Sequence, residues 1–346
     1  TDPVPEVERG GYEYWLAANL LEFESRPYTT IMYDQNNEAV KLPGYRIDAL
    51  TDAAIRYIDD HQKGTQKEKP IFLFLSYLEP HHQNHIDDYP APTGYRTRYQ
   101  GRWIPPDLAA LGGSTHQHIG GYFGMVKRLD EALGRLMDAL KSLGLEENTI
   151  LLFTSDHGNH FKTRNAEYKR SCHEASIRVP TVLTGPGFNG GGQIDELVSL
   201  IDLPPTLLDA AGIPVPVDME GRSILSLICA KTIEWPDDVF IQISESQIGR
   251  AVRTSRWKYS ICAPGGNAVL ESAADRYVEE FLYDLEADPH ELCNLIGYAS
   301  HQEVSAVMRK RLLRYIWEVE GHQPEILSAP ICESGQRIVT AEETLQ

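Results

Sequence analysis

Apolar positions along the chain follow two spacings, one typical of helices and one typical of buried strands. In residues 46–61 apolar side chains recur at 47, 50, 54, 55 and 58, and in residues 116–143 they recur every three or four positions as far as Gly144. This spacing puts them on one face of a helix, and a glycine is a common residue just after a helix end. The sequence therefore predicts two amphipathic helices, and a shorter helix is predicted over 203–211. Residues 12–24 fit a short strand or a helix equally well.

Residues 71–77 form a nearly continuous apolar run, which is typical of a strand buried on both faces of a parallel sheet. Two further strands are predicted over residues 149–154 and 179–184. Helical and strand patterns alternate up to about residue 235, which predicts an α/β domain over residues 1–235 with a mainly parallel sheet flanked by helices. Residues 81–106 form a long polar connection, and a loop of that length in a compact domain is usually functional or disordered.

The pattern changes after Pro214. Residues 239–244, 250–261 and 281–285 have strand character and are separated by turns, and residues 304–320 have helical spacing. Strands that follow one another and then a helix predict a small α+β subdomain with an antiparallel sheet. We assign residues 236–346 to this second domain.

Candidate chemistry gathers at the end of the 149–154 strand. Asp156, His157 and Gly158 follow the strand directly, and Lys169 lies thirteen residues after Asp156. A carboxylate and an imidazole suit a divalent cation, and a lysine nearby suits an anionic ester. Ligands in open α/β sheets bind beside such strand ends. Taken alone, however, an Asp-His-Gly turn and a lysine in a charged segment are more often ordinary surface residues.

Motifs in the same order along most of the chain resemble the sulfatase family of alkaline-phosphatase-like hydrolases. These are FLFLSYLEPHH at 72–82, TSDHG at 154–158, Lys169 five residues before Glu174, SIRVP at 176–180, RTSRWKY at 253–259 and LYDLEADPHELCNL at 282–295. The resemblance implies an alkaline-phosphatase-like sheet whose N-terminal part is missing from this chain. It implies hydrolysis of a sulfate ester.

The resemblance also assigns roles. Asp156 and His157 correspond to metal ligands, with Ca²⁺ expected and Mn²⁺ or Mg²⁺ possible. Lys169 neutralises the sulfate oxyanion, and His81 binds a sulfate oxygen and protonates the leaving group. His82 is the alternative to His81. Two further histidines flank the region as candidate substrate contacts, namely His160 and His173.

The family's nucleophile motif, Cys- or Ser-x-Pro-x-Arg, does not occur in the 346 residues, nor does the acidic pair that precedes it. Cys172, followed by His-Glu-Ala, does not replace it. The nucleophile then lies in a segment before Thr1, or the chain is a truncated, inactive relative, and in both cases we expect no turnover from these residues alone. A phosphonate or phosphate ester hydrolase of the same superfamily, and a non-catalytic binding protein, are the other hypotheses.

The amino-acid composition limits the classes of partner that we expect. The net charge of −18 disfavours a nucleic acid, and no apolar run is long enough for a membrane helix. We expect a small sulfated substrate, together with a missing N-terminal segment or a partner chain. The five cysteines are widely spaced and odd in number, which favours a reducing, cytoplasmic compartment. No signal peptide is visible, but the chain opens at Thr1 rather than Met, so a periplasmic or secreted location stays open.

Overall fold

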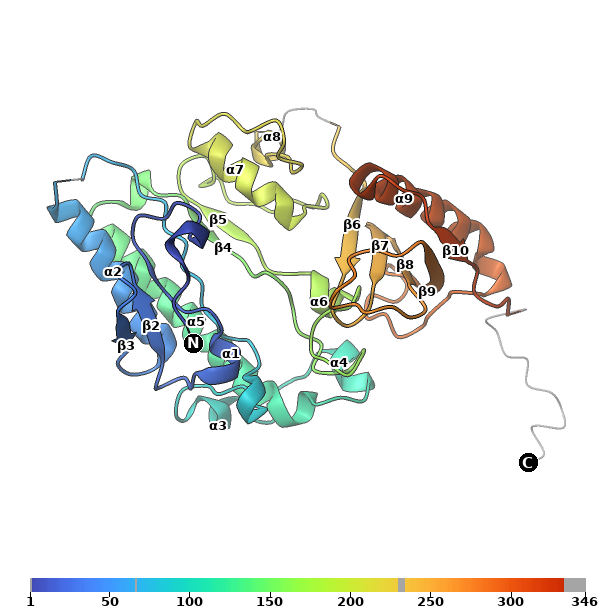
Figure 1. The fold of residues 1–346 in the computed structure, drawn as a ribbon, viewed down its shortest axis with the longest axis horizontal. Coiled ribbons are helices and arrows are strands. Elements are labelled where there is room, and N and C mark those ends of the chain that lie inside the picture. Colours follow the sequence, from blue (N-terminus) through green and yellow to red (C-terminus); the bar gives the residue numbers. More distant parts are fainter. Residues whose placement is uncertain (1, 66, 230–233, 333–346) are drawn as a thin grey trace. The chain divides into compact units, whose positions relative to one another are not determined.

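The computed structural model describes residues 2–65, 67–229 and 234–332, which form two compact units (Figure 1). One unit comprises residues 1–104 and 114–149, and the other comprises residues 105–113 and 150–346. The division into a catalytic domain and a C-terminal subdomain at 235/236 stays a prediction. The second unit includes the 157–177 loop because that loop is bonded to the C-terminal sheet by the contacts described below.

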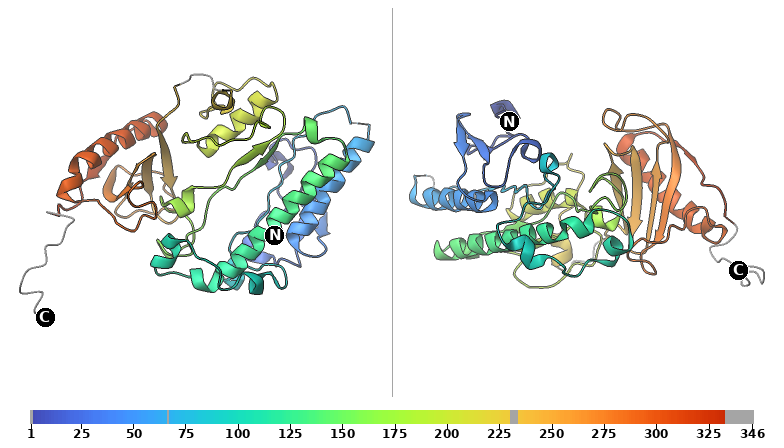
Figure 2. Two further views of the ribbon diagram at one scale, coloured as in Figure 1. Left: turned by 180° about the vertical axis from the view of Figure 1, so that it is seen from behind. Right: turned by 90° about the horizontal axis from the view of Figure 1, so that it is seen from below.

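The first unit is built on two long helices that run in the same direction, with Arg128 paired to Asp48 and Arg135 to Asp52, and on a small sheet. Its elements are β1 (Leu16–Ala17), α1 (Leu21–Glu24), β2 (Ile31–Asp34), β3 (Ala39–Lys41), α2 (Arg46–Lys63), α3 (Tyr95–Tyr99) and α5 (Thr115–Ser142), with short 3-10 turns at Glu6–Glu8, Asn84–Ile86 and Glu146–Asn148. The predicted helices at 46–61 and 116–143 are thus confirmed. Ile47 of α2 packs on Leu129 and Ala132 of α5, and Arg128 is hydrogen-bonded to Asp48 at 2.7 Å, so the helices lie side by side (Figure 2).

Residues 71–77 are extended but form no strand ladder among the described residues. Their side chains still alternate, since Leu75 and Tyr77 pack on the α2 core while Phe72 and Phe74 are 66% and 70% exposed. The prediction of a strand buried on both faces is therefore wrong for this segment.

The second unit contains the other two predicted strands and the C-terminal subdomain. Its elements are α4 (Pro106–Ala110), β4 (Leu151–Phe153), α6 (Glu174–Ile177), β5 (Val182–Thr184), α7 (Leu203–Ala210), α8 (Leu225–Ile228), β6 (Asp238–Ile243), β7 (Gly249–Thr254), β8 (Trp257–Cys262), β9 (Arg276–Asp284), α9 (Gln302–Glu320) and β10 (Glu325–Leu327), with 3-10 turns at Leu200–Asp202 and Ala299–His301.

β4 and β5 pair antiparallel, with Leu152 opposite Leu183. The sequence predicted these two strands but not the direction in which they pair. A parallel partner needs a crossover that carries the chain back to the start of the first strand. The four-residue helix α6 is too short to do so, and β5 begins at the end of the ladder where β4 stops.

The C-terminal subdomain confirms the predicted antiparallel sheet and closing helix. The strand order is β10-β9-β8-β7-β6, antiparallel except for the β10–β9 pair. The run at 250–261 proves to be a hairpin of β7 and β8. One face of the sheet is covered by α9 (Figure 2), whose Met308, Leu312 and Ile316 are fully buried against Tyr259 and Leu282. No helix in the described ranges is long and apolar enough to cross a membrane.

Candidate functional site

The turn after β4 carries Asp156 and His157 and is held by its own backbone. The His157 amide donates to Asp156 Oδ1 at 2.9 Å, and the Ser155 hydroxyl donates to the His157 carbonyl at 2.9 Å. The Gly158 amide donates to the carbonyl of Ser176 at 2.7 Å. A Cβ at Gly158 would lie 2.1 Å from the Ala175 carbonyl oxygen, so a side chain there is excluded by close packing against α6.

Asp156, His157 and Lys169 come together at this turn. His157 Nδ1 is 2.8 Å from the Gly158 carbonyl, so Nδ1 carries the proton in the neutral ring and Nε2 is the acceptor atom. The Lys169 ammonium lies 3.1 Å from that Nε2, and Asp156 Oδ2 lies 3.5 Å from it. Asp156 is otherwise open to solvent, with 84% of its side chain exposed. The carboxylate, the imidazole and the ammonium group therefore lie close together just beyond the end of β4.

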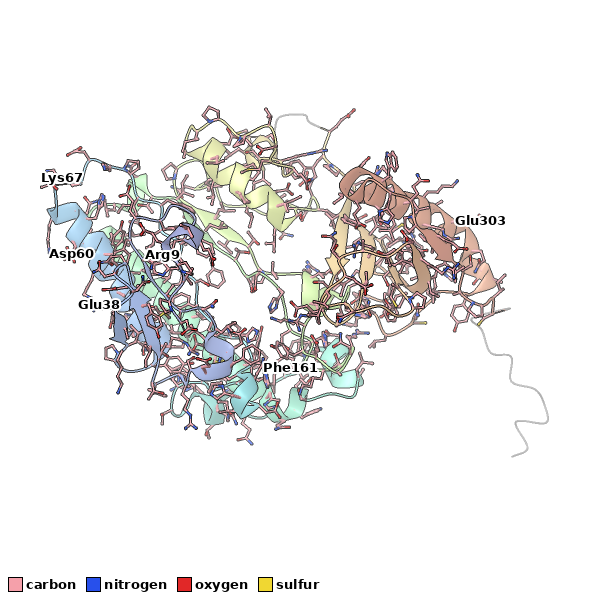
Figure 3. The ribbon with its side chains drawn as sticks, viewed as in Figure 1. Arg9, Glu38, Asp60, Lys67, Phe161 and Glu303 are labelled. Carbon is pink, nitrogen blue, oxygen red and sulfur yellow. The ribbon has the colours of Figure 1, made fainter. Side chains whose placement is uncertain are left out.

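His160 is fully buried and is hydrogen-bonded to the backbone of Lys169. Its Nε2 donates to the Lys169 carbonyl at 2.7 Å, and burial lowers the pKa of its imidazole. A neutral ring that donates to a backbone carbonyl positions that backbone, and the substrate contact suggested by the sequence stays a prediction. The next residue, Phe161, labelled in Figure 3, is also buried and adopts a left-handed backbone with φ 51°.

His173 is likewise 2% exposed. Its Nε2 lies 3.1 Å from the Tyr283 hydroxyl, and its ring packs on Phe281. Burial, together with Arg164 and Lys258 nearby, lowers the pKa of His173 to about 2. A permanently neutral, enclosed imidazole is suited to packing the loop against β9, so the structure gives no support to a substrate contact here either.

His81 and His82 belong to the first unit and are described within it. His81 is half-buried, and its Nδ1 is 2.6 Å from the carbonyl of His82. His82 is buried with Asn84 on Nδ1 and Asp87 on Nε2, each at 3.0 Å. The two histidines thus differ in exposure, because His81 is half-buried and His82 is buried.

The donor set at the β4 turn fits part of a metal site. Asp156 offers a hard carboxylate oxygen and His157 an imidazole nitrogen. The described residues contain no group of three or more His, Cys, Asp or Glu side chains placed to hold a metal. The pair therefore suits two positions of a larger ligand set.

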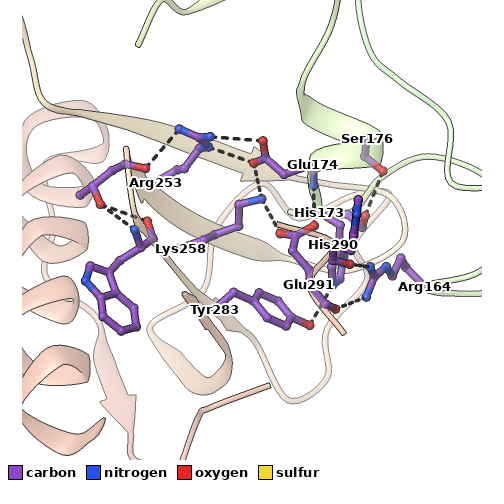
Figure 4. Close-up of polar contacts among 12 residues, drawn as sticks. Arg164, His173, Glu174, Ser176, Arg253, Lys258, Tyr283, His290 and Glu291 are labelled. Atoms are coloured by element: carbon purple, nitrogen blue, oxygen red, sulfur yellow. Dashed lines mark hydrogen bonds and ion pairs between the residues drawn. The ribbon is translucent and has the colours of Figure 1, made fainter. Parts of the chain in front are cut away.

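A buried ion network, which the sequence reasoning missed, fixes the loop that carries Lys169 (Figure 4). Lys258 of β8 is fully buried, and its ammonium lies 2.7 Å from Glu174 and 2.6 Å from Glu291. Arg253 donates to Glu174 at 2.9 Å. Glu291 in turn accepts the Glu174 amide at 2.7 Å, and Arg164 donates to the Glu291 carbonyl at 2.7 Å.

The pKa values of the two glutamates diverge in this network. Burial raises the pKa of Glu174, but Lys258 and Arg253 outweigh it, so the pKa lies below its ordinary value. Burial also raises the pKa of Glu291, and here the opposing effect of Lys258 is the smaller one. The signal was present in the sequence, because Glu174, Lys258 and Glu291 all lie in or beside the motifs quoted above.

Comparison with known proteins identifies this set of motifs. Residues 5–213 match the family model described as Sulfatase, and residues 166–318 match the model described as N-sulphoglucosamine sulphohydrolase, C-terminal. The chain belongs to the sulfatase family. Within this sulfatase, the C-terminal match spans the loop of Lys169, the ion network and the sheet that holds it.

Two curated relatives illustrate the match. Arylsulfatase K of Rattus norvegicus is 28% identical over 343 residues, covering 84% of this chain and 57% of the relative. The ulvan-active sulfatase of Formosa agariphila is 26% identical over 294 residues, covering 80% of this chain and 55% of the relative. This sulfatase chain thus spans little more than half the length of these relatives.

Solved structures show the same fold. The putative sulfatase yidJ from Bacteroides fragilis has a TM-score of 0.77 at 21% identity, covering 92% of this chain and 68% of that one. BT4656, solved in complex with its substrate D-glucosamine-2-N,6-O-disulfate, has a TM-score of 0.67 at 19% identity and covers 92% and 78%. The alkaline-phosphatase-like assignment of this sulfatase is therefore confirmed at the level of the fold.

Proposed function

We propose that this protein hydrolyses sulfate esters and that the chain supplies part of the active site. The observation that carries the proposal is the meeting of the Lys169 ammonium, the His157 imidazole and the Asp156 carboxylate beyond β4, with Lys169 Nζ 3.1 Å from His157 Nε2. A lysine ammonium held next to two side chains of the kind that bind metal ions suits a site where a terminal sulfate group lies beside a divalent cation.

The residues have separate roles in this proposal. Asp156 and His157 are two ligands of a divalent cation, Ca²⁺ in the first instance with Mn²⁺ and Mg²⁺ as alternatives, which when bound neutralises charge on the sulfate. Lys169 stabilises the negative charge that develops on the sulfate oxygens. His81 Nε2 carries the proton that passes to the leaving oxygen. A formylglycine-type nucleophile comes from a segment outside these 346 residues, because the Cys/Ser-x-Pro-x-Arg motif does not occur in them.

Turnover of 4-nitrophenyl sulfate by the protein expressed from its whole coding sequence tests the proposal. We expect calcium-dependent release of 4-nitrophenol, lost in Lys169→Ala. Parallel assays with 4-nitrophenyl phosphate and phenylphosphonate monoesters separate a sulfatase from a phosphate or phosphonate hydrolase. Faster cleavage of a phosphorus ester, or no cleavage of any ester, would reject sulfate-ester hydrolysis.

The 346-residue chain by itself gives the matching control. Purified alone, this chain should bind the aryl sulfate but should not hydrolyse it. Robust metal-dependent turnover by this chain alone would show that the nucleophile lies within it and would overturn that part of the proposal.

A further inference from the structure

Residues 78–81 form a tight turn that ends at His81. The His81 amide donates to the Leu78 carbonyl at 2.9 Å, so Glu79 and Pro80 occupy the two central positions of the turn. Because His81 is the last residue of this turn, the direction of its side chain follows the backbone of the central residues. Any contact that holds Glu79 therefore also orients the His81 imidazole.

The Glu79 side chain is held by a buried ion pair with Arg46, the first residue of α2. Only 1% of the Glu79 side chain is exposed, and the Arg46 side chain is fully buried. Glu79 Oε1 accepts hydrogen bonds from two nitrogens of the guanidinium, Nη2 at 2.8 Å and Nε at 3.1 Å. Two donors from one rigid planar group leave the carboxylate little freedom to turn.

Arg46 is fixed on its other side by the segment that precedes β2. Its Nη1 donates to the Ser25 hydroxyl oxygen at 2.6 Å and to Thr30 Oγ1 at 3.3 Å. The two hydroxyls donate in turn to backbone carbonyls, Ser25 to Leu21 at 2.7 Å and Thr30 to Arg26 at 3.1 Å. One guanidinium thus connects the turn at 78–81 to α2 and to residues 25–30.

Stability of the fold alone does not account for this pair. A buried ion pair gains little net stability over apolar side chains of similar volume, because both charges lose their hydration. One carboxylate oxygen adds to that cost here, since Glu79 Oε2 is buried and has no hydrogen-bond partner among the described residues. The pair does provide direction, because the hydrogen bonds of a guanidinium require one geometry whereas apolar contacts do not.

We propose that Arg46 and Glu79 are positioning residues for His81 and hold its imidazole in the orientation that protonates the leaving oxygen. The proposal rests on the proposed function, which makes His81 the leaving-group acid. Both side chains act through the turn, and both are buried. A misplacement of about 1 Å at a reacting group lowers a rate by about 10²-fold, so a small change in the turn has a measurable effect.

The first measurement compares a good and a poor leaving group in the whole protein, expressed from its complete coding sequence. Arg46→Lys keeps the charge but loses the paired donors of the guanidinium. It should lower kcat for phenyl sulfate, which has a poor leaving group, by about 10²-fold with KM unchanged. For 4-nitrophenyl sulfate, whose leaving group needs no proton, kcat should hardly change.

Two double variants separate positioning of His81 from support of the fold. Arg46→Met combined with Glu79→Leu replaces the ion pair by apolar side chains and should keep or raise the Tm of the parent. The loss of rate on phenyl sulfate should persist in this variant, because the turn has lost its directed contact. In a His81→Ala background, Arg46→Lys should cause no further loss, since a residue that acts through His81 then has no imidazole to orient.

Arg128→Ala is the matched control. It removes a less buried ion pair between α5 and Asp48 of α2 in the same unit, and it should lower the Tm without changing the ratio of the two rates. Three results would overturn the proposal. These are full recovery of the phenyl sulfate rate in the apolar double variant, a further loss from Arg46→Lys in the His81→Ala background, and an equal change of the rate ratio in Arg128→Ala.

A readout without turnover distinguishes this proposal from the proposed function. In the whole protein with isotope-labelled histidine, the NMR resonance of the His81 ring is assigned by its loss in His81→Ala. It should shift in Arg46→Lys and stay in place in Arg128→Ala. This shift without hydrolysis of any sulfate ester would reject the proposed function and keep the orientation of His81 by the pair. Hydrolysis of sulfate esters with an unchanged resonance and an unchanged rate ratio would keep the function and reject the positioning role.

Discussion

Replacing Lys258 by Met should destabilise the second unit strongly. The side chain is fully buried, and its ammonium lies within 2.7 Å of both Glu174 and Glu291. Methionine has a similar volume, so the loss is one of charge rather than of packing. Glu174 keeps Arg253 as a partner. Among the described residues the Glu291 carboxylate has no second cation, and only 2% of its side chain is exposed.

The expected magnitude follows from the cost of leaving one buried charge unpaired. Removing one partner of a buried ion pair costs about 3–5 kcal/mol in the free energy of unfolding. For a unit of this size each kcal/mol lowers the Tm by about 2–4 °C, so the Tm should fall by roughly 6–20 °C. Thermal unfolding followed by calorimetry measures the shift.

The pH dependence of the loss gives a sharper signature. Burial already raises the pKa of Glu291 against the effect of Lys258, and Lys258→Met should raise it further. A carboxyl whose pKa is higher in the folded state stabilises the fold below its unfolded pKa, and this stabilisation is lost as the pH rises through the folded pKa. Lys258→Met should therefore lose more stability at pH 8 than at pH 5.

Two further variants test whether the unpaired charge of Glu291 causes the loss of stability. Lys258→Met combined with Glu291→Gln should recover much of the lost stability, because the glutamine is neutral and its carbonyl still accepts the Glu174 amide. Arg256→Ala breaks a half-exposed pair with Asp284 and should cost no more than about 1 kcal/mol. A Lys258→Met Tm within 2 °C of the parent, or the same loss at both pH values, would show that the network does not hold the unit together.

Three other outcomes are expected. Asp156→Ala should abolish divalent-metal binding in the whole protein while leaving the fold intact, because its side chain is 84% exposed; elemental analysis of the purified variant checks this. Lys169→Ala and His81→Ala should each lower the rate about 10²–10³-fold, and only His81→Ala should hurt poor leaving groups more than good ones across a series of aryl sulfates. Gly121→Ala should destabilise the first unit by pushing the Tyr89 carbonyl away, whereas Gly134→Ala, with open space at its Cβ, should stabilise or leave it unchanged.

How far the sequence predicts this structure depends on how local each interaction is. The long helices α2 and α5 follow from spacing alone, because one apolar face decides them. The strand at 71–77 does not follow, since a continuous apolar run says nothing about which strand pairs with it. The direction in which β4 and β5 pair was not predicted, because it depends on the path of the intervening loop.

The candidate site, too, was predicted only in part. Asp156, His157 and Lys169 were predicted together, because they follow a strand and match a family spacing. The roles suggested for His160 and His173 found no support, since burial depends on which elements pack over a residue and is invisible in its neighbours along the chain. Helix α3 lies in the stretch 81–106, which was predicted as a long polar connection. The glycines of α5 that this stretch approaches closely lie on a different helix and are far away in the sequence.

The loop of Lys169 shows most clearly that residues far away in the sequence determine the shape of the site. Phe161, Lys162 and Arg170 all have left-handed backbones, a conformation that costs about 1 kcal/mol or more for residues other than glycine. His160 donates to the Lys169 carbonyl, and Ser246, beyond β6, donates to the Arg170 carbonyl at 2.8 Å. The strained loop therefore keeps its shape because the C-terminal sheet holds its backbone. Substitutions in that sheet should displace the Lys169 ammonium from His157 without touching either residue.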